Sequence, residues 1–234
     1  PFLASAVLVG IGLYIRLKLT ETPAFQNVID RNERVKVPVV TVLRDHGGML
    51  FMGTVAAIAT FAVFYLMTVF ALSWGTTALG YSRPQFLTLQ LFSVVFFGLT
   101  IPLSAVLADK YGRRGTMMAV NAVVALYGFS LAPLFGSGDV VMVTLFMAVG
   151  MALMGMTYGP LGTLLSELFP ASVRYTGASL TFNLAGILGA SVAPLIATSL
   201  AKSHGLVAVG YYLTGVSVLS LVALFFTRSH KSQG

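Results

Sequence analysis

The 234-residue chain is predicted to be an all-α integral membrane protein with six complete transmembrane helices. Its residues are 57% hydrophobic and only 9% charged, whereas a soluble domain carries about 25% charged residues. The mean hydropathy of the chain is +0.90. Six long apolar stretches contain no acidic or basic residue. Because so few charges cannot cover a surface that faces water, we expect the chain to be embedded in lipid.

The chain begins with an apolar stretch, Phe2–Ile15, that is too short to cross a bilayer. No basic region precedes it and no convincing small-residue cleavage site follows, so it does not resemble a signal peptide. We therefore expect residues 1–16 to be the end of a transmembrane helix that belongs to a longer protein.

One long polar stretch follows, from Arg16 to His46. Thr20–Pro23 has the composition of a helix start, and Phe25, Val28 and Ile29 then recur at helical spacing. We expect residues 17–47 to form a cytoplasmic loop with a short amphipathic helix that lies along the membrane surface. A disordered linker is the alternative.

Six complete apolar stretches come next, each of about 21 to 27 residues, which is enough to cross a bilayer. They are Gly48–Leu72, Pro84–Ala108, Gly115–Phe135, Val140–Leu165, Tyr175–Ala201 and Leu206–Thr227. A transmembrane barrel would instead need strands of about 10 residues that alternate polar with apolar side chains. Residues 48–227 are therefore predicted to form a six-helix bundle, followed by a short tail at 228–234.

The basic residues predict the orientation of these helices. Twelve of the 14 Lys and Arg residues fall in the first polar stretch, the second turn, the fourth turn and the tail. Only Arg83 and Lys202 fall in turns on the other side. Since cytoplasmic loops collect basic residues, the polar stretch, the turn at Asp109–Gly115 and the tail are expected in the cytoplasm.

That turn, with Asp109, Lys110, Gly112, Arg113 and Arg114, resembles the second copy of the loop signature of the major facilitator superfamily. Three further stretches narrow the resemblance to the metabolite:proton symporters of bacterial inner membranes, which include the shikimate, 2-oxoglutarate and proline/betaine carriers. They are Tyr14–Arg16 with Glu21–Phe25, Leu72–Gly75 with Leu79–Arg83, and Ser166–Pro170 with Val173–Gly177.

The resemblance covers essentially the whole chain, and it implies the end of helix 6, the central cytoplasmic loop and helices 7–12 of a twelve-helix carrier. An N-terminal six-helix half of the same protein would be the partner, with the substrate held between the halves near the midplane. The implied function is proton-coupled import of a small polar metabolite such as an organic acid. Alternatives are a sugar or drug carrier of the same superfamily and a non-transporting membrane sensor on the same fold.

The charges at the expected cytoplasmic helix ends are candidates for a gate. The resemblance supports this role for Asp109, Arg113, Glu167 and Arg174, and Arg114 lies in the same turn. Acids and bases at neighbouring helix ends, partly out of water, would attract each other in one conformation and separate in the other. The alternative is that these residues only set the topology and cap helices.

Polar side chains within the spans are candidates for substrate contact, because a polar group that faces lipid is costly. We select Tyr65, Gln90, Tyr158 and Asn183. In the fifth span, a small and weakly polar face is predicted from Ser179, Asn183, Gly186, Ala190, Ala193 and Ala197. Gly159 and Pro160 predict a kink, either to free a carbonyl for a ligand or to let the helix bend.

Other functions are disfavoured by what the sequence lacks. It contains no cysteine, its three histidines lack metal-site spacing, and no phosphate-binding glycine loop is present, so no metal, cofactor or enzymatic activity is expected. The basic residues, which give a net charge of +7, flank the apolar spans instead of forming one basic face, and this argues against binding of nucleic acid. No span contains an ionisable Asp, Glu, His, Lys or Arg, so a proton-coupling group is expected in the other half.

Overall fold

The computed structural model describes residues 9–15 and 38–227, and within these ranges every regular element is a helix. Residues 9–15 are helical, and α3 (Pro38–Asp45) precedes the bundle with only Val42 of its side chains buried. The expected amphipathic helix around Phe25 and the tail at 228–234 lie outside the described residues.

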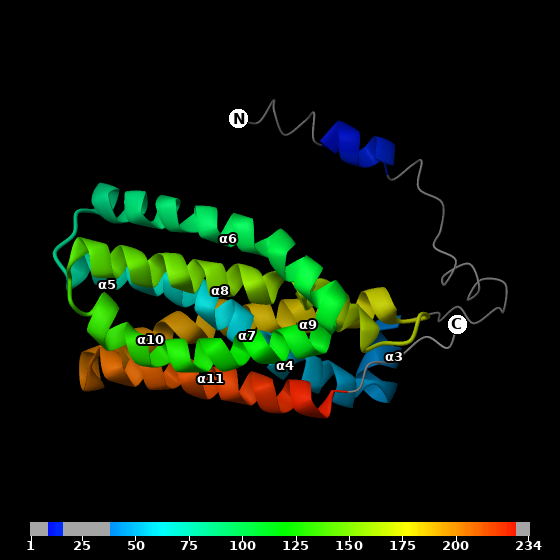
Figure 1. The fold of residues 1–234 in the computed structure, drawn as a ribbon. Coiled ribbons are helices and arrows are strands. Elements are labelled where there is room, and N and C mark those ends of the chain that lie inside the picture. Colours follow the sequence, from blue (N-terminus) through cyan, green and yellow to red (C-terminus); the bar gives the residue numbers. More distant parts are fainter. Residues whose placement is uncertain (1–8, 16–37, 228–234) are drawn as a thin grey trace.

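Six helical segments are long and apolar enough to cross a membrane, which confirms the predicted fold class (Figure 1). They are α4–η1–α5 (Gly47–Tyr65, Leu66–Phe70, Ala71–Thr77), α6 (Arg83–Tyr111), α7–η2–η3 (Arg113–Tyr127, Gly128–Ser130, Leu131–Phe135), α8 (Val140–Glu167), α9–η4–α10 (Arg174–Ile187, Leu188–Val192, Ala193–His204) and α11 (Leu206–Phe226).

The segments run up and down, so their turns gather at two ends of the bundle (Figure 1). We call the end with the Asp109–Gly115 turn the charged end, and the other the opposite end. At the opposite end, Ser82 and Gln85 form a capping box on α6, and the Asp139 carboxylate accepts hydrogen bonds from two backbone amides of α8. Gly205, at φ 78°, joins α10 to α11 in a conformation that favours glycine.

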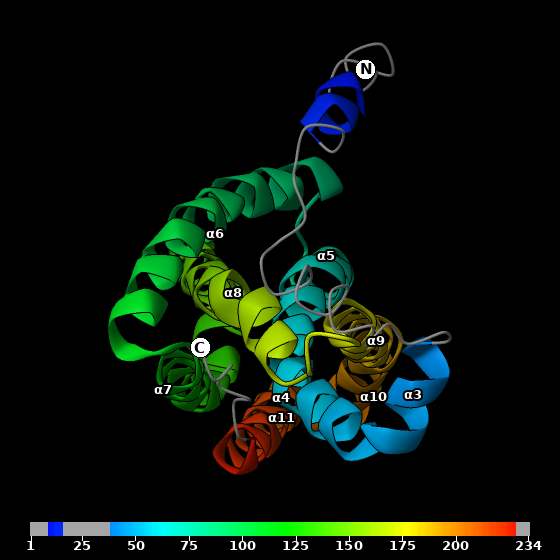
Figure 2. The ribbon, with the colours of Figure 1, turned by 90° about the vertical axis from the view of Figure 1, so that its right-hand side faces the viewer.

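Viewed along its axis, the bundle has α4 and α8 near its centre, with α6 and the α9–α10 segment outside them (Figure 2). The first segment is the most buried of the six and α6 the least. One core cluster contains stacked rings of Tyr127 and Phe146, with centroids 4.7 Å apart. A second cluster, which includes Leu165 and Phe169, closes the charged end.

The packed face of the fifth span differs from the predicted one. The buried residues follow a four-residue step along the whole span: Gly177, Thr181, Ala185, Gly189, Ala193, Ala197 and Ala201. Of the predicted face, Ala193 and Ala197 are buried, Gly186 and Ala190 are partly buried, and Ser179 and Asn183 are exposed. A four-residue step drifts around an ideal α-helix with 3.6 residues per turn. The wider π-helical turn η4 offsets part of this drift.

Candidate functional site

At the charged end, the turn between α6 and α7 contacts the ends of α8 and α11. Gly112, at φ 86°, separates α6 from α7 and accepts the first backbone hydrogen bond of α7 from Thr116, at 3.0 Å. A side chain at this φ would be strained, so glycine lets the two helices meet in a single-residue turn. The turn thereby places the two arginines that follow it at the start of α7.

Arg113 joins α7 to the ends of two other helices. Its guanidinium donates a hydrogen bond to the Glu167 carboxylate at the end of α8, and it lies 3.5 Å from the Asp109 carboxylate on α6. The Arg113 and Glu167 side chains are 36% and 32% exposed, whereas Asp109 is 73% exposed. Because water screens exposed pairs strongly, Arg113 with Glu167 is the stronger of the two contacts.

Arg114 has different partners. Its Nε donates to the Leu224 carbonyl at 2.7 Å, its Nη2 donates to the Phe225 carbonyl, and the guanidinium lies 6.0 Å from the Phe225 ring centre. These carbonyls end α11, where the helix dipole favours a cation. Arg114 therefore ties the start of α7 to the end of the last helix, a link between residues 110 positions apart that no sequence pattern indicated.

Arg174 begins α9, and its Nε donates to the Phe169 carbonyl at 3.3 Å. Among the ion pairs of residues 38–227, none joins Arg174 to Glu167. The charged end therefore brings Asp109, Arg113 and Glu167 together, while Arg114 and Arg174 bind backbone carbonyls nearby.

Gln90 is buried in α6, and its side chain contacts a turn of the first span. Its Nε2 donates to the carbonyls of Met67 and Thr68, at 2.9 and 2.8 Å. Both belong to the π-helical turn η1, which begins directly after Tyr65. The amide donors of Gln90 are thus occupied, and the side chain connects α6 to the irregular turn. The sequence marked Gln90 as polar within a span but did not indicate this partner.

Tyr158 lies in a row of aromatic rings from four helices. Its ring centre is 5.8 Å from Phe97 on α6 and 6.4 Å from Phe182 on α9, and Phe182 is 5.0 Å from Phe61 on α4. Phe182 was not among the residues predicted from the sequence, although it directly precedes Asn183. Tyr158 is 38% exposed, so its ring is accessible from outside this bundle.

The four selected cavity residues fall into two groups. Tyr65 and Gln90 lie around η1, whereas the Tyr158 ring contacts that of Phe182, which directly precedes Asn183 in α9. Asn183 is exposed, and its Nδ2 donates to the Ser179 carbonyl one turn earlier, at 2.8 Å. Tyr65 is partly buried and has the Phe64 ring 5.0 Å from its own.

Gly159 and Pro160 lie inside α8, which continues through them to Glu167. A Cβ on Gly159 would lie 2.7 Å from the Ile101 carbonyl oxygen, and a Cβ on Gly155 would lie 2.5 Å from that of Phe97. The two glycines therefore let α8 pack closely against α6, as small residues four apart do in membrane helices. Hydroxyl groups on α6 bridge the same contact, since Thr100 Oγ1 donates to the Ala152 carbonyl at 2.9 Å.

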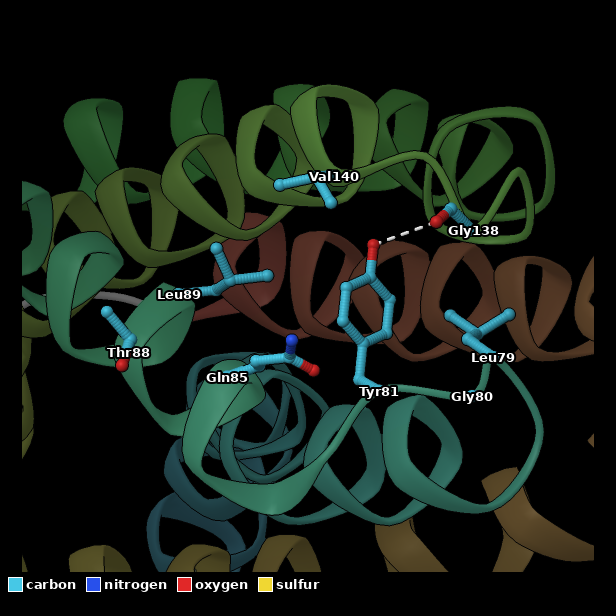
Figure 3. Close-up of a pocket in the computed structure, with 8 residues that line it drawn as sticks. All are labelled: Leu79, Gly80, Tyr81, Gln85, Thr88, Leu89, Gly138 and Val140. Carbon is cyan, nitrogen blue, oxygen red and sulfur yellow. Dashed lines mark hydrogen bonds between the residues drawn. The ribbon is translucent and has the colours of Figure 1, made fainter.

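A pocket of about 540 Å³ lies at the opposite end, between the turns before α6 and α8 (Figure 3). Tyr81 spans it, with its hydroxyl donating to the Gly138 carbonyl at 2.8 Å. Burial and the nearby Asp139 carboxylate raise the pKa of Tyr81, so the phenol stays protonated and remains a donor. Gln85 and Thr88 supply polar groups to the wall. This tie between two turns was not predicted from the sequence.

Comparison with known proteins adds to this geometry. The profile of the Major Facilitator Superfamily matches residues 1–187. The inner membrane metabolite transport protein YhjE of Escherichia coli is 44% identical over all of this chain and 54% of its own length. The Escherichia coli shikimate transporter is 28% identical, over 99% of this chain and 54% of its own length. The citrate-proton symporter of Klebsiella pneumoniae is 25% identical, over 95% and 50%.

The chain thus spans about half the length of the curated relatives it matches. The six membrane-length helices, the charged turn between the second and third of them, and the profile match over most of the sequence agree with one another. The chain belongs to the Major Facilitator Superfamily, and its relatives include metabolite transporters, as the sequence predicted.

Proposed function

We propose that this chain is the C-terminal half of a secondary active transporter that imports a small polar metabolite, such as an organic acid, together with protons. The observation that carries the proposal is the 44% identity, over the whole chain, to a metabolite transport protein. More distant relatives named as shikimate and citrate-proton carriers support an organic acid as the substrate and a proton as the coupling ion.

In this proposal, residues 48–227 are helices 7–12 of a twelve-helix carrier in a bacterial inner membrane. Residues 1–16 end helix 6, residues 17–47 form the central cytoplasmic loop, and residues 228–234 form a cytoplasmic tail. The charged end faces the cytoplasm, because twelve of the 14 basic residues belong to that side. An N-terminal six-helix half completes the substrate cavity.

The substrate path follows the outer faces of α6, α8 and α9. Asn183 is exposed on α9 and Tyr158 is partly exposed on α8. A polar side chain that faces hydrocarbon is costly, so this surface requires water or protein beside it. A cavity shared with the other half of the transporter would place both water and protein beside this surface. Tyr158 and Asn183 are therefore the proposed substrate contacts, whereas Tyr65 and Gln90 flank the π-helical turn that borders the cavity.

At the cytoplasmic end, the half-buried contact between Arg113 and Glu167 is the core of the proposed gate. It joins the start of α7 to the end of α8, so it must break for these helix ends to separate. Asp109 supports Arg113 from α6. Arg114 and Arg174 donate hydrogen bonds to backbone carbonyls of neighbouring helix ends. In this proposal, these contacts keep the neighbouring helix ends in place when the contact between Arg113 and Glu167 breaks.

Uptake by the full-length protein in vesicles tests this function. A pH gradient, acidic outside, should drive accumulation of at least one member of a panel of organic acids, zwitterions, sugars and drugs. A proton ionophore should abolish that accumulation. Uptake that ignores the ionophore would refute proton coupling. Uptake of sugars or drugs alone would favour those carriers, and binding without any uptake would favour a sensor.

The gate has its own test. Asp109→Asn and Arg113→Ala should impair uptake far more than they lower the amount of protein in the membrane. Lys202→Gln at the opposite end is the control, because the ion pairs among residues 38–227 do not include Lys202. Equal losses of uptake and of membrane protein would favour a role in topology and helix capping alone.

A further inference from the structure

The row of aromatic rings from four helices lies at a depth that holds no charged side chain. Its members are Phe61, Phe97, Tyr158 and Phe182. Phe97 is midway along α6. None of the six apolar stretches in the sequence contains Asp, Glu, His, Lys or Arg, and Glu167 lies about 13 Å farther along α8 than Tyr158. This half therefore presents rings, and no cation, near the midplane, where such carriers hold their substrates.

The row is accessible on the face of the bundle between α6 and α9. Seen along the bundle axis, α8 lies between these two helices (Figure 2). Tyr158 on α8 is 38% exposed, and Phe97 and Phe182 on either side of it are partly exposed. The Tyr158 ring plane makes angles of 60° with that of Phe97 and 69° with that of Phe182. Such edge-to-face contacts cover only part of each ring, so ring surface remains for a further group.

The polar groups beside the rings are neutral, and few of them can donate. The hydroxyl of Tyr158 makes no hydrogen bond within the described residues. Asn183 donates through its Nδ2 to the Ser179 carbonyl at 2.8 Å and to the Ser179 hydroxyl at 3.5 Å. Both amide hydrogens of Asn183 are thus directed at its own helix, and its Oδ1 can only accept. The Tyr158 hydroxyl is therefore the donor that this surface offers to a ligand.

A carboxylate does not suit this surface. The face of an aromatic ring carries negative electrostatic potential. An ion that leaves water needs a charged partner or several hydrogen bonds, and one neutral hydroxyl is not enough. A carboxylate of the substrate is therefore expected at the other half. A short molecule with a carboxylate at each end would have to place one of them against the rings.

We propose that the substrate is a ring-bearing acid with a single carboxylate. This inference rests on the proposed transport function and narrows its substrate class. The ring of the substrate packs against Phe97, Tyr158 and Phe182, a hydroxyl on that ring pairs with the Tyr158 hydroxyl, and the carboxylate points toward the N-terminal half. The aromatic row thereby selects against short di- and tricarboxylates.

Isothermal titration calorimetry of the purified full-length protein tests the substrate class with 4-hydroxybenzoate, benzoate, succinate and citrate. The two ring acids should bind, and succinate and citrate should bind at least about tenfold more weakly. Tighter binding of succinate or citrate, or no binding of either ring acid, would overturn this inference and leave proton-coupled transport standing. Ring acids that bind but are not transported would contradict the transport function and not this inference.

Substitutions test whether the row makes the contact. Tyr158→Leu and Phe182→Leu remove a ring and should weaken binding of benzoate about two- to tenfold. Phe129→Leu is the control, because that ring pairs with Tyr211 on α11, at 5.9 Å, outside the row. An equal loss in the control, or unchanged binding in both ring variants, would show that the row does not contact the ligand.

Tyr158→Phe separates the hydroxyl from the ring and keeps the packing of the row. It should weaken 4-hydroxybenzoate about two- to tenfold and leave benzoate unchanged. A purely structural role of Tyr158 would change both ligands alike or neither, and either result would contradict the proposed contact.

Discussion

Replacement of Gly159 by alanine tests whether close contact between α6 and α8 depends on this position. A Cβ there would lie 2.1 Å from Ser104 Oγ and 2.7 Å from the Ile101 carbonyl oxygen. The serine hydroxyl can rotate, but the carbonyl belongs to the helix backbone. Ordinary contact begins at 3.4 Å, so the two helices must separate by about 0.7 Å.

Overpacking of this kind costs about 1–3 kcal/mol. A loss of about 2 kcal/mol would lower the unfolding midpoint of a domain of this size by roughly 4–8 °C. The separation would also lengthen the hydrogen bond from Ser104 Oγ to the Gly155 carbonyl, now 3.3 Å. Thermal unfolding of the purified full-length protein in detergent, followed by circular dichroism, measures the effect.

Gly162→Ala is the matched control, because it lies one turn away on α8 and a Cβ there meets nothing within 4 Å. This variant should keep its midpoint or gain slightly, since alanine favours a helix over glycine by about 1 kcal/mol. Equal midpoints for Gly159→Ala and Gly162→Ala would show that the two helices have room for the added methyl group and would refute the argument.

Two other substitutions probe contacts between turns. Tyr81→Phe removes the hydrogen bond to the Gly138 carbonyl and should lower the free energy of unfolding by about 0.5–1.5 kcal/mol. Amide hydrogen exchange should then rise in both turns at the opposite end. Unchanged exchange would show that this hydrogen bond does not hold the two turns together. Gln90→Leu leaves the Met67 and Thr68 carbonyls without their side-chain donor and should cost about 1–3 kcal/mol. An unchanged unfolding midpoint for Gln90→Leu would show that η1 does not depend on it.

The membrane segments were predictable because their ends are marked by local chemistry. A charge cannot lie deep in a lipid-facing helix without cost, so Asp109 marks a helix end directly in the sequence. Gly112 and Gly205 adopt positive φ in the turns between helices, which glycine does at little cost. The residues at the charged end were predictable for the same reason. Their position at a helix boundary follows from their own polarity.

The contacts between helices were less predictable, because they depend on residues far apart in the chain. The sequence gives no sign that Arg114 binds the carbonyls that end α11, since any helix end would present the same groups. The π-helical turn η4 lies where Gly189 packs against Phe61, with a Cβ at Gly189 only 2.3 Å from that side chain. Such a turn depends on the neighbouring helix, and no local sequence pattern indicated it.

The central proposal for transport is that Arg113 and Glu167 form the cytoplasmic gate. Exchange of the two charges tests this proposal most directly. Uptake into vesicles is measured for Arg113→Glu, Glu167→Arg and the double variant, with equal amounts of each protein in the membrane. Each single variant places two like charges together and should lose at least about tenfold in uptake, whereas the double variant should recover much of it. Normal uptake by the single variants, or no recovery in the double variant, would contradict a gate formed by this pair.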